Sequence, residues 1–297
     1  MSRTPDLSRR NLVKLLGGMP LFPLAAGAST AMLTACGGGG SSNDSSTTAK
    51  ISSVSFTGMA APTLANPENI ATTYVDSSMV VTYSDSTTKT YELGYKTFFI
   101  TGEQVSDGAG GTVIAGGYYN IDNEPIYDTS VAVATRQFFS DCPDGSTLTT
   151  VSNPTVTGVT GNTVFAVVQF EYTTRNQALT SMYGLLPSPI AVLTLDQNKT
   201  TGELSLVKYH NVDTSGVKGL WITCGASLSP WGTHLSSEEY EPDAFNQGAN
   251  GSTLATLQGF SQNLFGNSST ASPYDYGHLP EVTVNKDGTA SIAKHYC

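Results

Sequence analysis

Charged residues are scarce in this chain, and basic ones are the scarcest. Asp, Glu, Lys and Arg together make up 13% of the 297 residues, with 14 basic side chains against 24 acidic ones. Globular domains average about 25% charged residues. Proteins bind nucleic acids through clustered Lys and Arg that neutralise backbone phosphates. The composition therefore argues against a nucleic-acid partner.

Long apolar runs are also missing, apart from one near the amino terminus. Residues 15–33 form a weakly apolar run that follows Arg9 and Arg10 and leads into Leu33-Thr34-Ala35-Cys36. This pattern is typical of a twin-arginine export signal that ends in a lipoprotein cleavage site. We expect residues 1–35 to be removed and Cys36 to carry the lipid.

A retained membrane-spanning helix is the weaker alternative, because Pro20 and Pro23 interrupt the apolar run. Residues 36–50 are rich in Gly and Ser, which predicts a flexible tether. Residues 51–297 then form the folded part. The chain is expected to be a periplasmic or outer-surface lipoprotein that contacts the membrane only through its lipid. The signal carries a net charge of +3, so its removal changes the formal charge from −10 to −13.

Cysteine is rare as well, with four residues in all. Assigning Cys36 to the lipid leaves Cys142, Cys224 and Cys297, which is an odd number. One disulfide could form in an oxidising compartment, but at least one thiol must stay unpaired. A metal ligand and a buried thiol are both open as its role.

The sequence also lacks long segments with helical periodicity. Short segments rich in Val, Ile, Thr, Tyr and Phe recur between turn residues, which predicts a mostly β chain. The predicted strands are 79–83, 89–93, 97–101, 163–172, 190–196, 204–210, 220–224, 233–239, 281–284 and 290–295. Hairpin turns are expected at 198–202 and 285–288, and one helix at 254–264.

Repeated hairpins over this length favour a β-propeller or a β-sandwich, and no strict internal repeat decides between them. The last predicted strand, 290–295, ends almost at the chain terminus without a closing segment. Either this strand tolerates an exposed edge, or the sequence is part of a longer protein.

The segment 220–242, LWITCGASLSPWGTHLSSEEYEP, contains several side chains that could react or bind a metal. Strand alternation predicts that Glu238 and Glu239 point to opposite faces. Gly225, Pro230 and Gly232 provide turn residues that could bring the second strand back beside Cys224.

A thiolate combined with carboxylates suits a transition metal such as iron, whereas carboxylates with other oxygens suit calcium. The plainer alternative is a buried free cysteine, a core tryptophan and a solvated acidic pair. His234 is expected to pack or to form hydrogen bonds rather than bind a metal.

The same segment strongly resembles the signature of the PhoX-type alkaline phosphatases, C-x-G/A-x-x-x-P-W-x-T-x-L-x-x-E-E. The segments GLLPSPIAVLTLDQ, SQNLFG and PYDYGHLPEVTVN look like further parts of that family. The resemblance implies a six-bladed β-propeller with a pair of Fe³⁺ ions and calcium ions in its central channel. It also implies hydrolysis of phosphate esters, whose repulsion by an acidic protein the cations would overcome.

By the same resemblance, Cys224 corresponds to the thiolate that contacts iron, and Glu238 and Glu239 to paired acidic residues beside it. Glu171, in QFEYTTRN, looks like a family acidic residue, although Phe170 stands where the family has a histidine. Glu281, after YGHLP, resembles a further metal ligand.

The family's chains are longer, so residues 51–297 would form only about half of a propeller. The missing part would supply further ligands, so the activity of this chain on its own is in doubt. The function expected first is that of an exported metallophosphatase. A non-catalytic lipoprotein that uses a propeller for binding is the alternative from another class. A calcium-only phosphodiesterase or phytase-like propeller is a third.

Overall fold

A computed structural model describes residues 49–71, 75–239, 242, 244 and 251–296. The chain divides into two compact units, Met1–Gly94 and Tyr95–Cys297. In the described residues of both units the regular structure is mostly antiparallel β-sheet with little helix, so the all-β class is confirmed. The predicted signal with Arg9 and Arg10, and Cys36 with most of the tether, lie outside the described residues.

The first unit contains a three-stranded sheet in the order β1-β2-β3. Its elements are β1 (Ile51–Thr57), α2 (Glu68–Ala71), β2 (Ser78–Tyr83) and β3 (Thr88–Glu92). Val81 is the one buried apolar side chain that the structure describes in this unit. The chemistry of the candidate site therefore has to be sought in the second unit, where the core lies.

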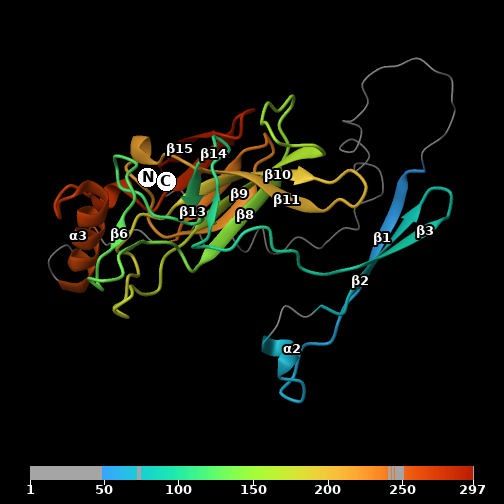
Figure 1. Cartoon of the computed structure of the whole chain (residues 1–297), viewed down its shortest axis with the longest axis horizontal. Helices are drawn as coiled ribbons and strands as arrows, with labels where there is room; N and C mark the ends of the chain where they lie inside the picture. The colour runs from blue at the N-terminus through green and yellow to red at the C-terminus, as the bar shows by residue number, and fades with distance from the viewer. Residues whose placement is uncertain (1–48, 72–74, 240–241, 243, 245–250, 297) are drawn as a thin grey trace, which may run out of the picture. The chain divides into compact units, whose positions relative to one another are not determined.

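Two four-stranded meanders dominate the second unit, as Figure 1 shows. The first has the order β11-β10-β9-β8 and the second the order β12-β13-β14-β15. Their strands are β8 (Pro143–Thr149), β9 (Asn162–Phe170), β10 (Ile190–Gln197), β11 (Leu204–Asn211), β12 (Thr223–Leu228), β13 (His234–Glu238), β14 (Leu279–Val284) and β15 (Ala290–His295). β8 lies beside β12, so the first strands of the two meanders are neighbours.

Both faces of the first meander are covered, which explains the nearly continuous burial of β9 and β10. On one face, Phe165 and Val192 pack with Val282 of the second meander. On the other, Val168 and Leu193 pack against side chains of the segment 98–113. Residues that alternate along one strand thus enter two different cores.

The remaining elements are short. They are β4 (Gln104–Ser106), β5 (Thr112–Ile114), β6 (Tyr127–Asp128), β7 (Arg136–Gln137), the 3₁₀ turns Ser215–Val217 and Pro273–Asp275, and α3 (Gly251–Phe265). α3 confirms the predicted helix and buries Leu257, Phe260 and Leu264 against Trp221 and Tyr276.

Both predicted hairpin turns are confirmed, with Gly202 and Gly288 at positive φ (77° and 74°).

The predicted strand 97–101 is wrong, because Phe98 and Phe99 pack on the core without a strand partner. β12 begins three residues later than predicted, at Thr223, since Ile222 has a left-handed φ of 43°. The six-bladed propeller stays a prediction.

Leu193 provides a test of this core. Its side chain is fully buried, whereas that of Leu148, on β8, is 55% exposed. We expect Leu193→Ala to lower the free energy of unfolding by about 2–5 kcal/mol, because a cavity replaces packed atoms. Leu148→Ala should change it by no more than about 0.5 kcal/mol. Urea unfolding of the two variants would measure the contrast, and equal losses would contradict this packing.

Candidate metal centre

Cys224 lies in a bulge at the start of the β12–β13 hairpin. The register pairs Thr223 with Glu238 and Ala226 with Ser236, which leaves an irregularity at Cys224 and Gly225. A turn closed by a hydrogen bond from Gly232 N to Ser229 O (3.0 Å) returns the chain. The predicted return of this strand to Cys224 is therefore confirmed. Bulges of this kind often re-aim a side chain beside a functional site.

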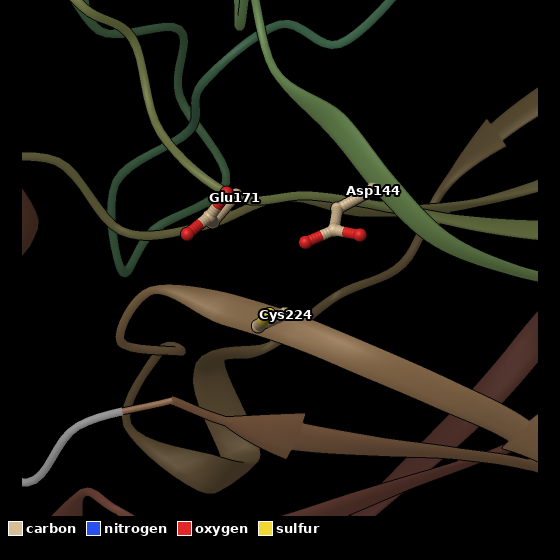
Figure 2. Close-up of side chains that lie close together, drawn as sticks. All are labelled: Asp144, Glu171 and Cys224. Carbon is tan, nitrogen blue, oxygen red and sulfur yellow. The ribbon is translucent and has the colours of Figure 1, made fainter.

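Three potential ligands meet beside this bulge. The ligand atoms of Asp144, Glu171 and Cys224 all lie within 4.8 Å of one another. Figure 2 shows their side chains converging from three separate segments. Asp144 belongs to a second bulge, in β8, and Glu171 directly follows β9, where its N–H donates to Cys142 O (2.9 Å). The structure thus brings the predicted residues Cys224 and Glu171 together and adds Asp144.

A glycine allows these segments to approach so closely. A Cβ atom on Gly145 would lie 2.6 Å from both the Cβ of Ala226 and the carbonyl oxygen of Cys224. Real Cβ atoms do not tolerate such contacts, so a side chain at this position would push β8 away from β12. The absence of a side chain at residue 145 therefore sets the distance between Asp144 and Cys224.

Glu239 completes the acidic surroundings of the cluster. Its backbone N–H donates to Ile222 O (2.9 Å), and its carboxylate helps to raise the pKa of Glu171. Glu239 is exposed, whereas Glu238 is buried, so the predicted opposite orientation of the two glutamates is confirmed. Only Glu239 of this pair faces the cluster.

Burial and acidic neighbours raise the pKa values of two groups in the cluster, Cys224 and Glu171. Burial, followed by the hydrogen bond and charge of Asp144, raises the pKa of Cys224 to about 11. Burial and the charges of Asp144 and Glu239 raise the pKa of Glu171 to about 7. Negative charge at these groups is unfavourable without a neighbouring cation. A bound cation would reverse this field and favour the deprotonated ligands.

The donor set fits a transition metal. One sulfur and two carboxylates combine soft and hard ligands, which suits iron better than calcium. Both cysteines in the described part, Cys142 and Cys224, are free thiols, so Cys224 is available as a ligand.

Glu238 has protein donors on both carboxylate oxygens. Oε1 accepts hydrogen bonds from Trp221 N (2.8 Å) and from Lys294 Nζ (3.0 Å), and Oε2 accepts one from His278 N (3.0 Å). The side chains of Glu238 and Lys294 are 0% and 1% exposed. Glu238 thus ties the start of the hairpin to β15, and its role as a metal ligand stays a prediction.

Glu281 is likewise engaged, away from the cluster. It accepts hydrogen bonds from Trp231 Nε1 (2.6 Å) and Thr233 Oγ1 (2.5 Å), and it pairs with His295 Nε2 (2.6 Å). These hydrogen bonds, that from Thr233 first, lower the pKa of Glu281 to about 2. Its carboxylate holds the turn between β12 and β13, and its predicted metal role also stays a prediction.

Asp144 is the residue that sequence reasoning missed. The sequence places it two residues after Cys142, in DCPDGSTLTT, where Thr and Leu alternate as in a strand. That local signal predicts β8 but says nothing of its contact with β12. His234, in contrast, is buried and hydrogen-bonded, as expected.

The chain matches no protein-family model, no curated protein and no solved structure. In the described part, no helix is both long enough and apolar enough to span a membrane. Any account of the function consequently depends on the geometry of the site and on the sequence motif.

Two lysines test the importance of the buried ion pair. Lys294→Met would leave Glu238 charged and unpaired in the interior, and we expect a loss of about 3–5 kcal/mol in the free energy of unfolding. The Lys218–Asp275 pair is the matched control, because the Lys218 side chain is 57% exposed. Lys218→Met should cost no more than about 1 kcal/mol. Similar losses in urea unfolding would contradict a structural role for Glu238.

The raised pKa of Glu171 predicts a pH dependence in the metal-free protein. The folded chain holds this proton more tightly than the unfolded chain, whose pKa is near 4.5. The stabilisation is therefore present below pH 4.5 and is lost as the pH rises through about 7. Metal-free Glu171→Gln should lose less stability over this range than the unmodified protein. Parallel curves of unfolding free energy against pH would contradict the assignment.

Proposed function

We propose that this chain belongs to an exported metal-dependent phosphatase that hydrolyses phosphate esters. The observation that carries the proposal is the cluster of Asp144, Glu171 and Cys224, whose ligand atoms lie within 4.8 Å of one another. Cys224 and Glu171 are two of the five residues that the PhoX-type resemblance links to metal binding, the others being Glu238, Glu239 and Glu281. Geometry and motif thus indicate the same position independently.

The proposed cofactors are iron, as an Fe³⁺ pair, and calcium. Cys224 would hold iron with Asp144 and Glu171, while Glu239 adds a carboxylate at the exposed margin of the cluster. Bound cations supply Lewis acidity and stabilise charge on the attacking and leaving oxygens of a phosphate ester. The chain's own residues would hold the cations and present them at an acidic surface that otherwise repels anions.

The propeller is proposed as the architecture of the complete protein. A propeller arranges four-stranded sheets around a central channel, and each sheet presents one edge to that channel. β8 and β12 are the first strands of two successive four-stranded meanders, they lie side by side, and they carry Asp144 and Cys224. This arrangement supports two blades with the site at their channel edges.

Export by the twin-arginine route and a lipid on Cys36 are proposed from the sequence. That route transports proteins already folded around their cofactors, which suits a chain that binds metal before it leaves the cytoplasm. The expected location is the periplasm or the outer surface.

Metal analysis of the purified protein tests the proposal. We expect iron in the unmodified chain and in Cys142→Ala, and at least a tenfold reduction in Cys224→Ala, because the thiolate ligand is lost. In the complete protein, hydrolysis of a chromogenic phosphate ester should fall on chelation and in Cys224→Ala, but not in Cys142→Ala.

Equal iron content in the two cysteine variants would overturn the metal centre. Calcium without iron would favour the calcium-only propeller. Iron binding through Cys224 without hydrolysis, in this chain and in the complete protein, would favour a binding scaffold.

A further inference from the structure

Three buried polar side chains form a hydrogen-bonded chain directly behind Cys224. They are Gln169 (0% exposed), His234 (1%) and Thr147 (8%). Polar groups are costly to bury unless each one is hydrogen-bonded, so a connected set at this depth needs a reason. None of the three belongs to the cluster of potential ligands.

The contacts lead from the first meander to the peptide of Cys224. Gln169 Nε2 donates to the carbonyl oxygen of Cys224 and lies 3.4 Å from that of Gly225. Gln169 Oε1 lies 3.2 Å from His234 Nε2, and His234 Nδ1 lies 2.9 Å from Thr147 Oγ1. We name this set, Gln169, His234 and Thr147, the glutamine relay.

The direction of every hydrogen bond in the relay follows from its first contact. Because the carbonyl of Cys224 can only accept, the amide nitrogen of Gln169 must face it, and the amide oxygen then faces His234. His234 must therefore carry its proton on Nε2, and its Nδ1 accepts from the hydroxyl of Thr147. Burial lowers the pKa of His234 to about 4, so the ring stays neutral at ordinary pH.

Each side chain of the relay lies on a strand that carries a residue of the cluster or leads directly to one. Thr147 lies on β8 with Asp144, Gln169 lies on β9 two residues before Glu171, and His234 lies on β13, which leads to Glu239. The regular ladder is interrupted where β12 bulges at Cys224 and where β8 bulges at Asp144. Gln169 supplies a donor to β12 where its pairing with β13 is irregular.

We propose that Gln169 is a positioning residue of the metal centre. Its amide fixes the peptide that carries Cys224 relative to Asp144 and Glu171, while His234 and Thr147 fix the amide. The proposal rests on the proposed function for the identity of the bound metal. The position of the Cys224 peptide can also be measured without metal.

The first experiment compares Gln169→Leu with Gln137→Leu. Gln137 is the matched control, because its Nε2 donates to another backbone carbonyl, that of Tyr118 (3.0 Å), outside the relay. Co²⁺ is the probe, read by its thiolate charge-transfer absorption. We expect Gln169→Leu to bind Co²⁺ about 10–100-fold more weakly, as loss of an outer partner does at metal sites, and Gln137→Leu to bind it normally.

The second experiment uses metal-free protein. Alkylation of Cys224, located by peptide mass spectrometry, should be faster in Gln169→Leu, while that of Cys142 should be unchanged. Nitrogen NMR should show His234 as the neutral Nε2–H tautomer in the unmodified protein. Loss of Co²⁺ affinity in His234→Leu should be restored in His234→Gln, whose amide can donate to Gln169 Oε1.

Isosteric Gln169→Glu serves if the leucine variant does not fold. Its carboxylate cannot donate to the carbonyl of Cys224, so it too should weaken Co²⁺ binding. Unchanged Co²⁺ affinity and unchanged Cys224 alkylation in a folded Gln169 variant would overturn the positioning role. Absence of a thiolate band in the unmodified protein would instead overturn the metal centre, and the alkylation and tautomer results would still decide the relay.

Discussion

The close approach of β8 to β12 is the constraint on which the site depends. It requires that residue 145 have no side chain, because a Cβ there would overlap the backbone that carries Cys224. The same approach brings Asp144 to the thiol and joins two successive meanders at their first strands. The packing of β8 on β12 therefore determines the geometry of the candidate site, and displacement of either strand would separate the ligands.

Gathering these ligands disfavours their charged forms in the metal-free protein. Burial, together with the charges of Asp144 and Glu239, raises the pKa values of Glu171 and Cys224. Functional sites commonly break the local rules that the rest of a fold obeys, and other contacts must compensate. Here the compensation comes from the buried core of β9 and β10, the hydrogen-bonded glutamine relay and the Glu238–Lys294 pair. A cation in the cluster would favour the charged forms.

Sequence reasoning predicted the parts of the site that are local. The turn residues between β12 and β13 were enough to place the end of β13 near Cys224, and the alternation along β13 was enough to place Glu238 and Glu239 on opposite faces. Which of the two faces the cluster could not be read from the sequence. Asp144 and Gln169 escaped prediction, because their roles arise only where β8 and β9 meet a hairpin far along the chain. Strand periodicity predicts faces, but it does not say which strands from different sheets become neighbours.

The adjacent glutamates of the β12–β13 hairpin have different roles, since one anchors the backbone and the other faces the cluster. Glu238 points inward, where Lys294 and two backbone N–H groups satisfy both of its oxygens. Its neighbour Glu239 points outward to the cluster, so its position depends on the backbone that Glu238 anchors. On the opposite strand, the relay holds the carbonyl of Cys224 from behind in the same manner. The two potential ligands of the hairpin, Cys224 and Glu239, are therefore each held by a buried polar contact, which for Cys224 is at its own carbonyl and for Glu239 is at the adjacent residue, Glu238. These contacts restrain the backbone of the site and use no ligand atom.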